Sequence, residues 1–235
     1  GRARRRARSQ VSSEPELWWL GARLSGEADL KRLGELEYLL EGAWVGGRNS
    51  AGWARFPRQQ DVRGRALGAN VSWEIELPLE PTLTFEYAFG SGDSRPKRGP
   101  DRNFRQTGLQ SNEGRFDGVN YFHYYGELLQ PELSNLQIWT AALGFPFWRS
   151  SSIEFVYHLY RQVHPAPFLR DTRIDVNPTG RKRGIGQGWD IVLGMQEWQH
   201  VEIDLIGSFF RAGSAYARRS GKNAFALLFK IDFTF

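Results

Sequence analysis

The strongest constraint on the fold is a two-residue alternation of apolar and polar side chains that recurs along most of the chain. In residues 224–235 large apolar side chains occupy every second position, and the intervening positions become polar towards the end of the segment. Successive side chains of a β-strand point to opposite faces, so the alternation predicts strands with one apolar face. We expect nine strands, at residues 15–28, 31–46, 62–78, 81–91, 135–146, 150–164, 184–196, 199–212 and 222–235.

The connections between these segments alternate in length. The short ones lie near residues 29–30, 79–80, 147–149 and 197–198, and the long ones cover residues 47–61, 92–134, 165–183 and 213–221. The long connections are rich in Arg, Gly, Pro, Asn and Ser, which is the composition of loops. Short turns at one end and long loops at the other are typical of an outer-membrane β-barrel.

Two architectures fit such alternation, one soluble and one in a membrane. A soluble β-sandwich buries its apolar face against a second sheet, whereas a membrane barrel turns that face to lipid. The expected strands are longer than the usual ~5–6 residues, and aromatic side chains gather near their ends, where they can form girdles at the lipid headgroups. These are Trp18, Trp19, Trp44, Trp53, Phe145, Phe147, Trp148, Trp189, Trp198 and Phe235. We therefore expect an all-β, transmembrane antiparallel barrel in the outer membrane of a Gram-negative bacterium.

The odd number of strands predicts that more strands belong to the barrel. Single-chain bacterial barrels have an even number of strands, and an open sheet would leave two unpaired edges in lipid. We expect residues 1–235 to be one barrel domain that is incomplete at its N-terminal side, the C-terminal half of a larger barrel.

Charge and composition exclude several function classes. Lys and Arg total 31 and Asp and Glu total 26, but five arginines lie within residues 1–8, and the remainder balances at 26 of each sign. We interpret the arginine run as an external loop near anionic lipid or polymer, not as a nucleic-acid arm. The chain has no cysteine, which excludes a disulfide scaffold and a thiol nucleophile. Its four histidines have no metal-ligand spacing, and no serine lies in a nucleophile motif, so we expect no metal, no cofactor, no catalytic residue and no enzyme activity.

Residues 103–136 carry the most specific motifs. They include Asn103-Phe-Arg-Gln-Thr-Gly-Leu109, Tyr124-Tyr-Gly-Glu127 and Pro131-Glu-Leu-Ser-Asn-Leu136. This region resembles the signature region of the bacterial alginate export family, the outer-membrane porins that secrete alginate. The resemblance implies an eighteen-stranded barrel, of which nine strands are half, and a porin that conducts an alginate-like polyuronate out of the periplasm. It also implies partner proteins in a periplasmic secretion complex.

A channel for a polyuronate needs cations that bind each carboxylate weakly. Arginine suits this role because its planar fork meets a carboxylate in two parallel hydrogen bonds, and weak, distributed binding lets the polymer move on. Two candidates lie on the polar faces of the first and last strands, two lie near the outer end of the third strand, and three lie in the long loop, which could fold inward and narrow the pore. In that order they are Arg23, Lys230, Arg63, Arg65, Arg102, Arg105 and Arg115.

Alternatives remain open at this point. Arg105 could form an ordinary salt bridge within the loop, and Arg161 and Arg211 fit a rim that faces lipopolysaccharide phosphates. Carboxylates on the inner face could pair with inward arginines or weaken the positive field for a moving polyanion. A general or small-solute porin, a soluble carbohydrate-binding sandwich and an outer-membrane hydrolase with an acid–base pair are the competing functions.

Overall fold

The chain forms one large antiparallel sheet. A computed structural model describes residues 16–50, 59–107, 112–116 and 120–235. Nine strands pair in the order β1-β2-β3-β4-β7-β8-β9-β10-β11, and a separate hairpin joins β5 to β6. The strands are β1 (Glu16–Asp29), β2 (Glu35–Ser50), β3 (Gln59–Glu74), β4 (Thr82–Gly90), β5 (Glu113–Phe116), β6 (Asn120–His123), β7 (Leu136–Phe147), β8 (Ser151–Gln162), β9 (Gly184–Trp198), β10 (Val201–Ala212) and β11 (Asn223–Phe233).

The nine expected strands are confirmed; most bounds differ by one or two residues, and those of β2 and β3 differ by more at both ends. The strand expected at 31–46 is β2, which begins at Glu35 because Lys31–Leu33 form a short 3-10 helix, η1. The strand expected at 62–78 is β3, which ends at Glu74 because the following residues form a turn with a Glu80 N–H to Leu77 carbonyl hydrogen bond. The β5–β6 hairpin lies within the expected long loop and was not predicted.

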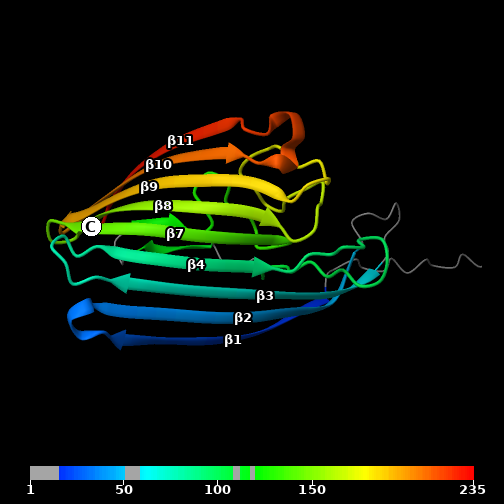
Figure 1. Cartoon of the computed structure of the whole chain (residues 1–235), viewed down its shortest axis with the longest axis horizontal. Coiled ribbons are helices and arrows are strands. Elements are labelled where there is room, and N and C mark those ends of the chain that lie inside the picture. Colours follow the sequence, from blue (N-terminus) through cyan, green and yellow to red (C-terminus); the bar gives the residue numbers. More distant parts are fainter. Residues whose placement is uncertain (1–15, 51–58, 108–111, 117–119) are drawn as a thin grey trace, which may run out of the picture.

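The turns and loops are segregated to opposite ends of the sheet. Figure 1 shows the short connections β1–β2, β3–β4, β7–β8 and β9–β10 at one end, together with the C-terminus. The long connections β4–β7 and β8–β9 lie at the other end, where a second short 3-10 helix, η2 (Ser214–Arg219), precedes β11. We call these the turn end and the loop end. The predicted alternation of connection lengths is confirmed for the described connections. Of the connection expected at 47–61, residues 51–58 lie outside the described residues and the rest belongs to β2 and β3.

One face of the sheet, the outward face, is apolar and exposed. On β11 the side chains of Phe225, Phe229 and Phe233 are 74%, 61% and 61% exposed. The same face continues across the sheet with exposed Ile191, Phe155, Phe85, Leu67, Leu40 and Leu20. Within the described residues no second sheet covers these side chains. The sandwich alternative needs such a cover, so the structure gives it no support.

The opposite, inward face is covered at the loop end by the chain's own long loop. Leu128, Leu129 and Leu133 of that loop are buried against Leu136, Ile138, Tyr160 and Phe210, which point inward from β7, β8 and β10. A second buried cluster joins Phe104 of the loop to Val45 and Val62 on β2 and β3. The main core therefore lies between the sheet and the loop that folds onto it.

The remaining features of the fold are the two edges of the sheet and the aromatic side chains near the strand ends. In the described chain β1 and β11 each pair on one side only, and no helix there is long and apolar enough to cross a membrane. Trp18, Trp44 and Trp189 lie exposed on the outward face, as expected. Trp19 does not, because its parity turns it inward, where its Nε1 donates to the Arg105 carbonyl at 2.8 Å. Trp53 lies outside the described residues.

Candidate functional site

The inward face carries polar and charged side chains from every strand of the large sheet. The strand register places the inward side chains of each strand beside the inward side chains of the neighbouring strand. At inward positions of the described strands the cations are Arg23 and Lys230, and carboxylates outnumber them. The inward carboxylates are Glu27, Asp29, Glu35, Glu37, Glu41, Glu74, Glu86, Glu154, Asp190, Glu202, Asp204 and Asp232.

Arg23 and Lys230 lie inward, as predicted, and both are paired with carboxylates. Arg23 on β1 donates from Nε to Glu41, the residue directly opposite on β2. Lys230 on β11 lies 2.5 Å from Asp232 Oδ2 and 3.9 Å from Asp204 Oδ2. Each pair remains partly exposed, so solvent screens the attraction between the two charges.

A buried polar network on β7, β8 and β9 was missed by the sequence reasoning. His158 Nδ1 lies 2.9 Å from Thr140 Oγ1, directly across the strand pair, and its Nε2 lies 3.4 Å from Asp190 Oδ2. All three side chains are buried. The alternation predicts that each of these side chains points inward. It does not predict that they lie side by side, because that depends on the register between neighbouring strands, which the sequence of a single strand does not determine.

The long loop is anchored on the inward face by hydrogen bonds as well as by its leucines. Tyr160 Oη on β8 donates to the Tyr125 carbonyl at 2.9 Å. Burial is the main cause that raises the pKa of the Tyr125 phenol above its ordinary value, and the nearby carboxylates of Glu86 and Glu41 raise it further. The phenol therefore stays neutral and can act as a hydrogen-bond donor beside those carboxylates. These contacts place the loop on the inward face at the loop end, in keeping with the inward folding that the sequence suggested.

Arg105 lies in this loop, and its side chain is largely buried. Its Nη2 lies 2.5 Å from Asp101 Oδ2, and its side chain is 14% exposed. Phe104 beside it packs on Val45 and Val62. The structure thus contains the loop salt bridge that was the alternative for Arg105. A role of Arg105 towards the polymer stays a proposal.

Three further candidates do not line the interior. Arg63 and Arg65 share the outward face of β3 with Leu67 and Val71, because side chains of one parity share a face. Arg102 follows Asp101, which forms a parallel bridge with Val62, so Arg102 aligns with Arg63. The prediction that these three arginines face the lumen is therefore not supported by their positions.

The remaining basic candidates divide between the rim and the undescribed part. Arg161 and Arg211 are exposed on the outward face at the loop ends of β8 and β10, in keeping with the rim interpretation. Arg115 lies on β5, whose side chains are outside the described part of the structure. The arginine run of residues 1–8 is also outside the described residues.

Comparisons with known proteins agree with this geometry. A family model described as alginate export matches residues 1–228. The alginate production protein AlgE of Pseudomonas aeruginosa is 25% identical over 221 residues, which cover 86% of this chain and 45% of that protein. The protein of the same name from Azotobacter vinelandii is 29% identical over 174 residues, 63% of this chain and 36% of its own length. The match thus spans less than half of each relative. Since the family model covers almost the whole chain, the chain belongs to the alginate export family.

Proposed function

We propose that this chain forms part of an outer-membrane β-barrel that conducts an alginate-like polyuronate out of the periplasm of a Gram-negative bacterium. The observation that carries the proposal is the two-faced sheet: an exposed apolar outward face backed by a charged inward face. Such a sheet is suited to a membrane barrel, in which the apolar face contacts hydrocarbon and the charged face contacts water. Family membership supplies the cargo, since the family is described by alginate export.

A closed barrel requires further strands beyond the nine described. Unpaired backbone groups at the free edges of β1 and β11 would each cost several kcal/mol in lipid. We propose that about nine more strands of a longer protein pair with both edges and complete an eighteen-stranded barrel. Outer-membrane lipid, lipopolysaccharide and periplasmic secretion proteins are the partners of this assembly, which uses no cofactor and catalyses no reaction.

The polymer path runs along the inward face and past the long loop. Arg23, Lys230 and Arg105 are the described cations that we assign to it, each already held beside a carboxylate. A uronate group competes with that carboxylate for the cation, so binding stays weak and the polymer moves from site to site. The surplus of inward carboxylates implies that additional cations come from the remaining strands and from loop residues.

A general small-solute porin is the competing function, and the carboxylate-rich inward face favours it. The test is a planar-bilayer recording of the full-length protein in the presence of oligomannuronate or of a neutral dextran of matched size. Export of a polyuronate predicts that oligomannuronate blocks the current and that dextran does so much less. Cation-selective currents that respond equally to both polymers would contradict the proposal.

The variant Arg23→Gln/Lys230→Gln tests the assigned cations in the same recordings. We expect weaker block by oligomannuronate, on the order of tenfold in the blocking concentration, because two charge-assisted hydrogen bonds are lost. The matched control is Arg149→Gln, an exposed arginine in the β7–β8 turn. Equal block in the double variant and the control would remove these two residues from the polymer path.

A further inference from the structure

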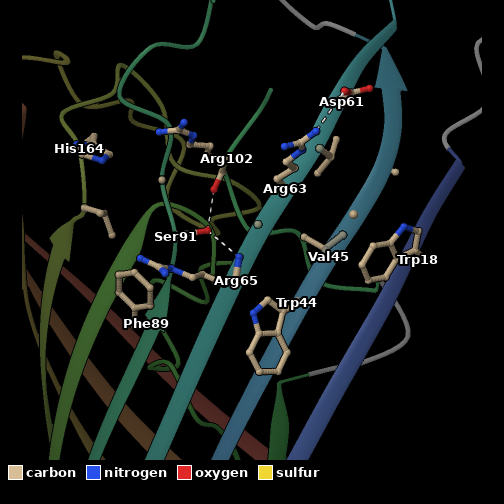
Figure 2. Close-up of a pocket in the computed structure, with 16 residues that line it drawn as sticks. Trp18, Trp44, Val45, Asp61, Arg63, Arg65, Phe89, Ser91, Arg102 and His164 are labelled. Carbon is tan, nitrogen blue, oxygen red and sulfur yellow. Dashed lines mark hydrogen bonds and ion pairs between the residues drawn. The ribbon is translucent and has the colours of Figure 1, made fainter. Parts of the chain in front are cut away.

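The outward face holds a second basic site, distinct from the interior, at the loop end of β2, β3 and β4. A groove of about 840 Å³ lies there, and Arg63, Arg65 and Arg102 line it together with Trp18, Trp44 and Phe89. Figure 2 shows these arginines and Trp44 drawn on neighbouring strands and on the adjoining loop. The aromatic side chains belong to the same outward face as Leu67 and Val71. The groove therefore adjoins the surface that meets lipid.

The charge in this groove is unbalanced. Asp61 is the one carboxylate among its described lining residues. Its two oxygens face Arg48 Nε at 3.7 Å and Arg63 Nη2 at 3.9 Å, so it is shared between two guanidinium groups. Arg65 and Arg102 add two more positive charges to the same groove. The side chain of Arg63 is 73% exposed, so its guanidinium is available to an external anion.

Ser91 fixes the backbone of two of these arginines. The Arg65 N–H donates to Ser91 Oγ at 2.9 Å, and Ser91 Oγ donates to the Arg102 carbonyl at 2.7 Å, as the dashed lines in Figure 2 mark. The parallel bridge between Val62 and Asp101 aligns Arg102 with Arg63. The loop after β4 is thus held beside β3, and three guanidinium groups are kept on one side of the sheet.

Aromatic side chains line the groove beside the arginines. Trp44 is directly opposite Arg65 in the β2–β3 register, and Trp18 is opposite Gly46. The Trp18 ring lies over that glycine, since a Cβ at Gly46 would come within 2.4 Å of the ring. Rings of this kind settle at the level of lipid headgroups, where one side is apolar and the other wet.

We propose that this groove binds the phosphate groups of an anionic outer-leaflet lipid of the lipid A type, whose acyl chains lie along the outward face below it. Charge complementarity selects phosphate, because arginine forks form paired hydrogen bonds with phosphate oxygens. Position selects a lipid over the exported polymer, since the groove opens on the outward face. The inference rests on the proposed membrane insertion and adds a defined lipid site to it.

The test is native mass spectrometry of the full-length protein in detergent micelles, with bisphosphorylated lipid A or the same lipid stripped of its phosphates. We expect the wild type to prefer the phosphorylated lipid by on the order of tenfold or more. The variant Arg63→Gln/Arg65→Gln/Arg102→Gln loses this preference, and Ser91→Ala reduces it. Arg149→Gln, an exposed arginine at the turn end, keeps it.

Two competitors distinguish the source of the anion. Inorganic phosphate at the lipid's concentration leaves the bound lipid in place if the acyl chains contribute, and oligomannuronate does the same if the groove lies outside the polymer path. Displacement by either competitor, or a triple variant that retains the preference, would overturn the inference. A wild type that binds phosphorylated lipid A yet is not blocked by oligomannuronate in bilayers would overturn the export proposal alone.

Discussion

Single residues on β8 divide between the two faces, and Tyr160 is the one that ties the long loop to the sheet. Its hydroxyl donates to the Tyr125 carbonyl, and the ring is buried among the leucines of the loop. Tyr157, three residues earlier, lies on the outward face, and its ring centroid lies 5.4 Å from that of Trp189. The two tyrosines therefore allow a matched comparison.

We predict that Tyr160→Phe lowers the free energy of unfolding by about 1 kcal/mol, because the Tyr125 carbonyl loses its donor. It should also speed hydrogen exchange of the amides in residues 124–130. Tyr157→Phe should leave that exchange unchanged. Equal exchange in the two variants would show that the Tyr160 hydroxyl does not hold the loop.

A substitution of Arg23 is expected to affect ion conduction more than stability. Its ion pair with Glu41 is largely exposed to solvent, and exposed pairs contribute roughly 0–1 kcal/mol. We predict that Arg23→Gln changes the free energy of unfolding by less than about 1 kcal/mol while shifting the reversal potential towards cation selectivity. A large loss of stability, measured by urea unfolding in micelles, would mean that the pair is structural.

Among the elements, the loop between β4 and β7 covers the inward face of the sheet at the loop end. Phe104 anchors one part of it in the cluster with Val45 and Val62, and Trp19 bonds to the neighbouring Arg105 carbonyl. Removing the buried ring deletes apolar contacts that are worth about 3–5 kcal/mol in a protein core. Losing these contacts is expected to loosen the loop from the inward face while the strand pairing stays intact.

We therefore predict that Phe104→Ala raises the single-channel conductance of the full-length protein in planar bilayers. Phe85→Ala, which truncates an exposed ring on the outward face of β4, serves as the control and should leave conductance unchanged. An unaltered conductance in Phe104→Ala would indicate that this segment does not narrow the path.

The elements also show what the sequence could and could not predict. Alternation was enough for nine strands and their faces, because burial on one side imposes a period of two. It failed at strand ends: Ile75 and Leu77 continue the alternation beyond Glu74, where the chain already turns. Arg63 and Arg65 were assigned to the lumen from their place near a strand end, although their parity already matched Leu67. The His158 network depends on the register between strands, which local pattern does not encode. The salt bridge between Arg105 and Asp101, four residues apart, is the alternative that the sequence left open.

At the scale of the whole molecule, the middle of the outward face, away from the loop end, should tolerate no charge in lipid. Phe229 and Leu228 are adjacent on β11, but Phe229 points outward and Leu228 points inward opposite Ile206. An arginine on the lipid face near the bilayer midplane costs about 2–4 kcal/mol. We predict that Phe229→Arg impairs folding into lipid vesicles, assayed by heat-modifiable gel mobility, far more than Leu228→Arg does. Equal impairment would mean that the two faces do not meet different solvents.

The most direct test of the central claim is a cysteine scan of β11 in the full-length protein, since this chain has no cysteine of its own. Each single cysteine from residue 224 to residue 233 is labelled with a fluorophore, and quenching is measured with a lipid-borne and with a water-soluble quencher in vesicles. The account predicts that labels at 225, 227, 229, 231 and 233 are quenched from lipid and that labels at the even positions are quenched from water. Quenching without a two-residue period, or water access at the odd positions, would contradict it.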